Sequence, residues 1–182
     1  MTERRPTVGL PSGALLLAAY DPAWADAFEE ERALIAEAFG GLPARVEHVG
    51  STSVPGLAAK PIIDILVGRP PESALEPYVD ALVGAGYEYR GEYGIPGRHY
   101  FVRGLAPAAR THHLHMVALG SALWRDHLAF RDYLRAHPEA AAAYEALKRE
   151  LAARHADDRG AYSEAKAPFI RGVVAAADPP SE

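Results

Sequence analysis

Apolar and polar residues follow two kinds of repeat along this chain. Short runs with apolar residues at alternate positions, or with apolar residues throughout, predict β-strands. Longer segments with apolar residues every three to four positions predict helices. The predicted strands cover residues 14–19, 45–49, 61–67, 87–90, 99–103 and 112–119. The predicted helices cover residues 22–39, 73–85, 123–136, 140–155 and 162–176.

The order of these elements predicts an α+β fold: a mixed sheet of four to six strands flanked by helices, with further helices at the C-terminal end. Residues 1–13 are polar and contain two prolines, so we expect a loose N-terminal arm. We expect residues 14–177 to form a single domain, with a sheet-containing core over 14–120 and a helical part over 121–177.

Composition narrows the range of functions. The 182 residues carry a net charge of −5, and a nucleic-acid-binding protein would usually be basic, so we do not expect a nucleic-acid partner. The chain has no cysteine, which excludes disulfides and thiolate metal sites. No apolar run approaches the length of a membrane span, and no signal-like segment follows the first residues. We therefore expect a cytoplasmic protein without a membrane partner, and the sequence leaves homo-oligomerisation open.

The strongest chemical signal lies between the second and third predicted strands. Gly50-Ser51-Thr52 follows strand 45–49 directly, and a Gly-Ser turn exposes backbone N–H groups that can hold phosphate. Lys60 precedes the next strand, where it can add a positive charge. Asp64 interrupts that apolar strand, and a buried carboxylate requires a partner or a metal ion. A tight turn with one hydrogen-bonded aspartate is the simpler alternative.

His113 and His115 share one face of the strand 112–119, because alternate residues of a strand point the same way. With Asp64 they would form a site of one carboxylate and two histidines for Mg²⁺, Mn²⁺ or Zn²⁺, or they would transfer a proton. Glu47 is a further candidate ligand, since either Glu47 or His48 should face the site. The alternative is that the histidines are only hydrogen-bonded.

Two arginines and a glutamate complete the candidate site. Arg98 and Arg110 flank a predicted pair of strands, and a guanidinium group suits phosphate or carboxylate ligands. Glu92 lies in the glycine-rich loop 91–97, which could close over a ligand. The alternative for each of these residues is an ordinary surface charge.

The chain also resembles the GrpB family, whose members are similar to a compact branch of the nucleotidyltransferase superfamily. The resemblance extends over nearly the whole chain beyond the first dozen residues. It is carried by the stretch Glu47–Val67 and by Tyr20-Asp21-Pro22-Ala23-Trp24, Gly91-Glu92-Tyr93-Gly94-Ile95-Pro96-Gly97-Arg98, Arg110-Thr111-His112-His113-Leu114-His115 and Phe130-Arg131-Asp132-Tyr133-Leu134. It implies a nucleotidyltransferase-like fold, and relatives of this domain occur fused to a dephospho-coenzyme A kinase.

The same resemblance implies a nucleoside triphosphate substrate, with the Gly-Ser turn at the triphosphate. It also implies two metal ions on a pair of carboxylates two residues apart on the next strand. This chain has Asp64 at the first of those positions and Leu66 at the second. The leading hypothesis is therefore an enzyme that transfers a nucleotidyl or phosphoryl group or activates an acceptor with ATP. The alternative is a non-catalytic nucleotide-binding or assembly module with a degenerate site. The sequence does not identify the acceptor or the base.

Overall fold

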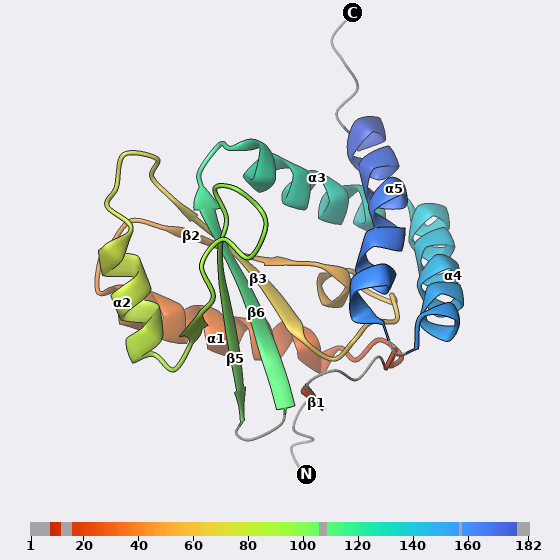
Figure 1. The fold of residues 1–182 in the computed structure, drawn as a ribbon, viewed down its shortest axis with the longest axis horizontal. Helices are drawn as coiled ribbons and strands as arrows, with labels where there is room; N and C mark the ends of the chain where they lie inside the picture. The colour runs from red at the N-terminus through yellow and green to blue at the C-terminus, as the bar shows by residue number, and fades with distance from the viewer. Residues whose placement is uncertain (1–7, 12–15, 106–108, 157, 178–182) are drawn as a thin grey trace, which may run out of the picture.

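The computed structural model describes residues 8–11, 16–105, 109–156 and 158–177, and in this part a single sheet is flanked by helices (Figure 1). The strands are β1 (Leu10–Pro11), β2 (Arg45–Val49), β3 (Ile63–Arg69), β4 (Glu88–Tyr89), β5 (His99–Leu105) and β6 (Ala109–Ala118). The helices are α1 (Ala23–Phe39), α2 (Glu76–Gly84), α3 (Ala122–Ala136), α4 (Pro138–Arg154) and α5 (Arg159–Ala177), with a 3₁₀ turn over Ser51–Ser53. Among the described helices, none combines the length and the apolar composition that a membrane span requires.

The predicted mixed α+β architecture is confirmed. The strand order is β2-β3-β6-β5-β4, and β1 pairs with β6. β3 and β6 are parallel, whereas the other pairs are antiparallel. The two parallel strands occupy the centre, so the residues expected to carry chemistry on β3 and β6 lie side by side. The register places Asp64 opposite His113 and Leu66 opposite His115.

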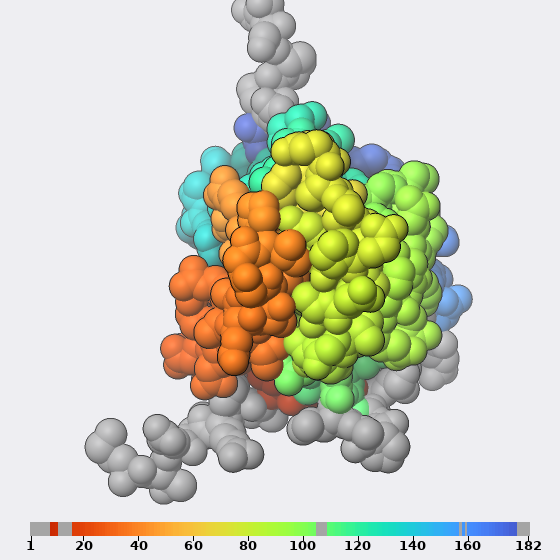
Figure 2. All heavy atoms as spheres, turned by 90° about the vertical axis from the view of Figure 1, so that its left-hand side faces the viewer, coloured from red at the N-terminus to blue at the C-terminus, as the bar shows by residue number. Residues whose placement is uncertain are grey.

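One face of the sheet packs against α1 and α2. Every second residue of β3, beginning with Ile63, points to this face, and the side chains there are fully or almost fully buried. Figure 2 shows α1 (orange) and α2 (yellow-green) side by side on this side of the molecule. The members of this core include Trp24, Phe28, Ile35, Tyr78, Leu82, Phe101, Leu114 and Met116.

A buried carboxylate fastens α1 to the same face. Glu31 is 6% exposed, and Arg103 of β5 donates to both of its oxygens while the Tyr87 hydroxyl donates to one. Burial and the neighbouring Glu31 charge raise the pKa of Tyr87. His112 Nε2 lies 3.8 Å from the Glu31 carboxylate, on the opposite face from His113, as the strand alternation predicts.

The other face is covered only in part. Leu66 and its neighbours Val49 and Val117 pack beneath Trp124 of α3. The C-terminal helices then continue past the sheet and pack on the turn after β2, through Val54, Leu57, Leu134 and Tyr144. Figure 1 shows α4 and α5 beside the end of the sheet at which the Ser51–Ser53 turn lies. A cavity remains between these helices and the uncovered part of the sheet.

Two details differ from the predicted pattern near the N-terminus. Residues 16–19 do not form the predicted strand: Ala18 makes only an isolated antiparallel bridge to Ala59. The backbone N–H and carbonyl of Ala18 hydrogen-bond to those of Ala59, in the segment before β3. This one pair of hydrogen bonds stands in place of the series that a paired strand would make. Residues 14 and 15 of that prediction lie outside the described residues. Within the predicted loose arm, Leu10 is buried and pairs with Arg110 of β6.

Candidate functional site

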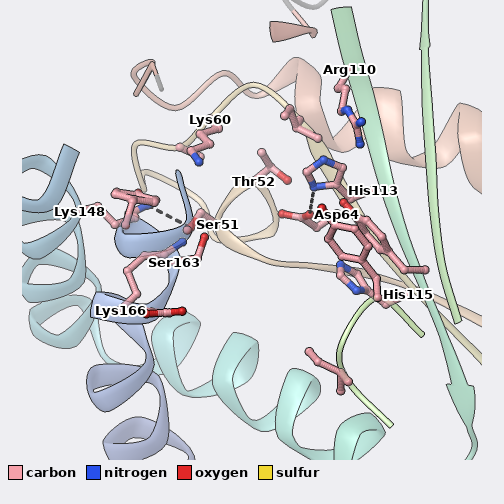
Figure 3. A pocket seen from close by; sticks show the side chains of 18 of the residues that line it. Ser51, Thr52, Lys60, Asp64, Arg110, His113, His115, Lys148, Ser163 and Lys166 are labelled. Carbon is pink, nitrogen blue, oxygen red and sulfur yellow. Dashed lines mark hydrogen bonds and ion pairs between the residues drawn. The ribbon is translucent and has the colours of Figure 1, made fainter. Parts of the chain in front are cut away.

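The cavity has a volume of about 1010 Å³ and is lined by residues from several separate segments of the chain (Figure 3). The sheet contributes Asp64, His113 and His115, the turn after β2 contributes Ser51 and Thr52, and α4 and α5 contribute lysines. Most of the residues that the sequence predicts for the site therefore come together. The predicted residues among the lining are Ser51, Thr52, Lys60, Asp64, Arg98, Arg110, His113 and His115.

Gly50 allows the turn to approach the carboxylate. Its backbone has φ 69° and ψ −172°, a region that only glycine adopts readily. A Cβ atom on Gly50 would lie 2.5 Å from Asp64 Oδ2, too close for non-bonded atoms. The carbonyl of Gly50 then accepts a hydrogen bond from the Ser53 hydroxyl at 2.6 Å, which closes the turn. The glycine thus fixes how closely Ser51 and Asp64 face one another.

α3 holds the same turn from outside. Arg135 donates two hydrogen bonds to the Ser53 carbonyl, at 2.9 and 2.8 Å, and Arg131 donates one to the His48 carbonyl. Behind the turn, His48 Nε2 lies 2.9 Å from the Thr52 hydroxyl, and its ring stacks on Phe28. Burial lowers the pKa of His48 to about 4, so this imidazole stays neutral and packs as part of the scaffold.

Asp64 and His113, which both line the cavity, form an acid–base pair in direct contact. His113 Nδ1 lies 3.3 Å from Asp64 Oδ1. Burial by itself raises the pKa of Asp64, but the hydrogen bond and the charge of His113, together with His115 and Lys166, bring it below its ordinary value. Asp64 is therefore ionised near neutral pH, and its contact with Nδ1 orients the His113 ring.

His115 is in a different situation from His113. Burial, followed by the neighbouring His127, lowers its pKa to about 3. Its ring lies between Tyr100, with ring centroids 5.3 Å apart, and His127, at 5.5 Å. Among the residues that the structure describes, none hydrogen-bonds its buried Nδ1 atom. His115 is thus a neutral ring that lines the cavity and lies between two other rings, tilted against both.

The donor atoms do not fit a pair of catalytic metal ions. Leu66, at the position of the second carboxylate, is fully buried beneath α3. Glu47, the other candidate, bonds Arg45 and Arg131 and is not among the described residues that line the cavity. Within the described part of the chain, no three histidine or acidic side chains lie close enough to hold an ion. Because Mg²⁺ and Mn²⁺ sites depend on several oxygen ligands, Asp64 alone is insufficient.

Lys148 of α4 is the main site residue that the sequence analysis missed. It is 2% exposed, and its ammonium group donates to the Ser51 hydroxyl at 3.0 Å and to the Ala58 carbonyl. Burial, followed by the charge of Lys166, lowers the pKa of Lys148 to about 7. The signal in the sequence is its position: Lys148 follows Tyr144 by four residues and precedes Leu151 by three, on the buried stripe of α4.

A second group of cations lies beside Lys148. Lys60 and Lys166 both contact the ring of Tyr162, with their Nζ atoms 4.5 and 4.4 Å from its centroid. Figure 3 shows Lys60, Lys148 and Lys166 on one side of the cavity and the Asp64–His113 pair on the other. The described lining contains the cations Lys60, Arg98, Arg110, Lys148 and Lys166, against the carboxylates Asp64 and Glu164. The cavity is therefore positive although the whole chain carries a charge of −5.

Arg98 and Glu92 were predicted to contact a ligand, and the structure gives both a role in shaping a loop. Arg98 is 9% exposed and donates to the carbonyls of Glu92 and Tyr93. Glu92 is absent from the described lining residues, and its carboxylate accepts a hydrogen bond from the Gly97 N–H at 2.7 Å. Both side chains thus hold the segment 91–98 that borders the cavity.

Comparison with known proteins agrees with this architecture. The sequence profile of the GrpB protein family matches residues 14–176. The UPF0157 protein YqkA of Bacillus subtilis is 42% identical over 152 residues, which cover 84% of this chain and 44% of YqkA. A UPF0157 protein of Pseudomonas aeruginosa is 42% identical over 156 residues, which cover 85% of this chain and 64% of that protein. The chain therefore spans less than two thirds of the length of these two relatives.

Two relatives have the name dephospho-CoA kinase, which refers to a known activity. A dephospho-CoA kinase of Mycolicibacterium paratuberculosis is 30% identical over 174 residues, which cover 83% of this chain and 43% of the kinase. This match agrees with the fusion that the resemblance implies.

Two solved structures are similar to the fold. GrpB from Enterococcus faecalis superposes with a TM-score of 0.77 at 41% identity, over 89% of this chain and 96% of that chain. The Cid1 poly(U) polymerase superposes with a TM-score of 0.52 over 81% of this chain and 49% of that chain. Because its sequence identity is 13%, the second match supports the nucleotidyltransferase-like fold alone.

Proposed function

The chain belongs to the GrpB protein family, and from its cavity we propose that it binds a nucleoside triphosphate or a phosphorylated small molecule of similar size. The observation that carries this proposal is the positive cavity beside the Gly50-Ser51 turn, with Lys148 directly on the Ser51 hydroxyl. A volume of about 1010 Å³ is sufficient for a nucleotide. The Cid1 structures of the same fold contain bound nucleotides, which supports the same class of ligand.

In this proposal the phosphates lie against Ser51, Lys148 and Lys166. Hydrogen bonds between ammonium groups and phosphate oxygens are stronger than neutral ones, and burial strengthens them further. These cations neutralise the phosphate charge, as metal ions on paired carboxylates do in the chemistry that the family resemblance implies. A divalent ion that arrives with the nucleotide belongs to the substrate in this account.

The Asp64–His113 pair supports a reaction in addition to binding. In nucleotidyl transfer, an acceptor hydroxyl attacks the α-phosphorus, a new P–O bond forms, and the bond to pyrophosphate breaks. The hydroxyl proton would pass to His113, which Asp64 holds in the tautomer that leaves one ring nitrogen unprotonated. The departing pyrophosphate would remain beside Lys148 and Lys166, which stabilise its charge.

A second candidate function is a nucleotide-binding module without catalysis. The buried Leu66 supports it, because the carboxylate pair of the implied family chemistry is missing from this strand. An assembly role beside a kinase domain would be consistent with the dephospho-CoA kinase relative. This candidate predicts ligand binding without any turnover, whereas the first predicts both.

Thermal unfolding in the presence of nucleotides tests the proposed binding. We expect ATP to raise the midpoint temperature of unfolding without added metal, because cationic side chains hold its phosphates in this proposal. A ligand at a hundred times its Kd stabilises a protein by about 2.7 kcal/mol. GTP, CTP and UTP should be compared, each with Mg²⁺, with Mn²⁺ and with EDTA. Adenosine at the same concentration is the control and should give a much smaller shift, because it lacks the phosphates. No shift with any triphosphate under any of these conditions would refute the proposal.

Lys148 also gives the binding a pH dependence. The pKa of this lysine lies at about 7 in the free protein, so it is protonated below pH 7 and loses its proton above. A phosphate then has to bind together with a proton, so the Kd for ATP should rise about tenfold per pH unit between pH 7.5 and 9. The groups that set this pKa after burial are Lys166, Glu145, Arg149 and Asp64.

Calorimetric titration at several pH values measures this effect. The Lys148→Met variant should bind ATP more weakly and show a flat profile over the same range. Lys166→Met keeps Lys148 but removes a charge that lowers its pKa, so this variant should bind ATP more weakly and its profile should still slope, with the slope beginning at a higher pH. An equally steep slope in Lys148→Met would assign the pH dependence to another group.

A further inference from the structure

The loop before β5 presents an aromatic ring at the edge of the cavity. Tyr93 is 69% exposed, although tyrosine is usually at least half buried, and Ile95 beside it is 39% exposed. Tyr93, Gly94 and Ile95 all line the cavity that contains Asp64 and Lys148. An exposed aromatic ring at a cavity whose lining carries more cations than carboxylates needs an explanation, because the phosphate contacts do not use it.

The backbone at this tyrosine is strained. Tyr93 has φ 47°, and among the described residues it is the one residue other than glycine with a positive φ. A side chain in this region costs about 1–2 kcal/mol relative to the ordinary conformations. Gly94 and Gly97 on the C-terminal side also have positive φ, and they provide the freedom that the rest of the tight turn needs.

The loop is nevertheless held firmly by its own contacts. The nearly buried Arg98 donates hydrogen bonds to the carbonyls of Glu92 and Tyr93, at 3.2 and 2.8 Å. The Glu92 carboxylate accepts from the Gly97 N–H, and the Tyr100 N–H bonds the Gly91 carbonyl. These bonds fix the Tyr93 backbone in the strained conformation, so the ring is presented before any ligand binds.

The ring of Tyr93 continues a column of aromatic rings. It stacks on Tyr100, with centroids 5.3 Å apart and planes 28° apart, and Tyr100 in turn lies 5.3 Å from His115. Tyr100 is 9% exposed, so it is already covered, whereas Tyr93 keeps most of its surface open. Another planar ring can therefore extend the column at Tyr93 with little rearrangement.

We propose that Tyr93 stacks on the nucleobase of the ligand, with Ile95 as an apolar edge beside it. The ligand of the cavity is then a nucleotide and not merely a phosphorylated sugar or acid, and this proposal rests on the proposed function above. The phosphates lie at Ser51, Lys148 and Lys166, and the base lies at the rim. Because every base has a π-face, this contact selects for a planar ring without selecting one base.

Calorimetric titration of ATP and of inorganic tripolyphosphate separates the two ends of the site. Tyr93→Asn removes the ring with little added strain, because asparagine adopts positive φ more readily than other residues. We expect it to weaken ATP binding about tenfold, which is a typical stacking contribution, and to leave the Kd for tripolyphosphate unchanged. Tyr93→Phe should bind ATP within about threefold of the wild-type Kd, since it keeps the ring. Val83→Ala, at an exposed residue of α2, is the control and should change neither.

The outcomes distinguish this inference from the proposed function. If Tyr93→Asn leaves the affinity for ATP unchanged, or weakens tripolyphosphate by the same factor, the stacking role is wrong while phosphate binding stands. If the wild-type chain binds tripolyphosphate as tightly as ATP and Tyr93→Phe loses ATP affinity, the ring does not act by stacking. If the wild-type chain binds neither compound, the proposed function itself fails.

Discussion

Replacing Gly50 with alanine is expected to destabilise the protein by about 3–5 kcal/mol and to weaken ATP binding by about two orders of magnitude. Two effects add at this position. The backbone conformation, φ 69° and ψ −172°, is one that alanine rarely adopts, and the new Cβ atom would lie 2.5 Å from Asp64 Oδ2. Relief of that clash requires Ser51 and Asp64 to separate, so the phosphate contacts of the turn are lost together with stability.

Urea denaturation measures the loss of stability, and calorimetric titration measures the affinity for ATP. Two other glycines provide controls for both measurements. Gly40 also has a positive φ, at 55°, but nothing lies within 4 Å of its added Cβ, so Gly40→Ala should cost only the backbone term of about 1–2 kcal/mol. Gly84 has neither a positive φ nor a close neighbour, and Gly84→Ala should be neutral or slightly stabilising. If Gly50→Ala lowers the stability no more than Gly40→Ala does, the close approach of the turn to Asp64 does not contribute to stability.

Replacing Asp64 with asparagine should have opposite effects on binding and on turnover. In EDTA the variant should bind ATP a few-fold more tightly, since loss of a negative charge from a positive cavity improves the binding of an anion by about 1 kcal/mol. The release of pyrophosphate from ATP should fall by about two to four orders of magnitude, because His113 loses the group that orients it. An account in which Asp64 holds a metal ion predicts that binding and turnover fall together.

Glu47→Gln is the matched control for this comparison. Glu47 is a carboxylate on the neighbouring strand that pairs with Arg131 outside the cavity, so its loss should leave both the affinity and the rate within about twofold. Weaker ATP binding by Asp64→Asn in EDTA would contradict the proposed arrangement of charges. Ligand binding without measurable pyrophosphate release by the wild-type chain would favour the non-catalytic module.

The fold follows closely from the hydrophobic pattern. The strand 61–67 is apolar except at Asp64 and its apolar residues are buried, as expected of a central strand, and β3 indeed pairs on both sides. The turn at Gly50 and the interruption at Asp64 were visible because each breaks an otherwise regular pattern. The strand predicted over 14–19 failed at residues 16–19 because an apolar run without alternation does not identify a pairing partner.

The roles of the charged residues were harder to predict. Lys148 and the turn at Ser51 are 97 positions apart in sequence, and only packing of α4 on that turn brings them together. Arg98 appears in the sequence as a cation beside a glycine loop, which fits a phosphate ligand as well as the backbone carbonyls that it contacts. Side-chain type therefore indicates what a residue can bind, whereas burial and neighbours decide which partner it has.

A crystal structure with bound ATP would test the central claim most directly, since that claim concerns where the phosphates lie. The account predicts phosphate oxygens within hydrogen-bond distance of the Ser51 hydroxyl and of the ammonium groups of Lys148 and Lys166, with the adenine ring against Tyr93. Phosphates held instead through metal ions on Asp64, with Lys148 still turned to the Ala58 carbonyl and away from the ligand, would contradict it.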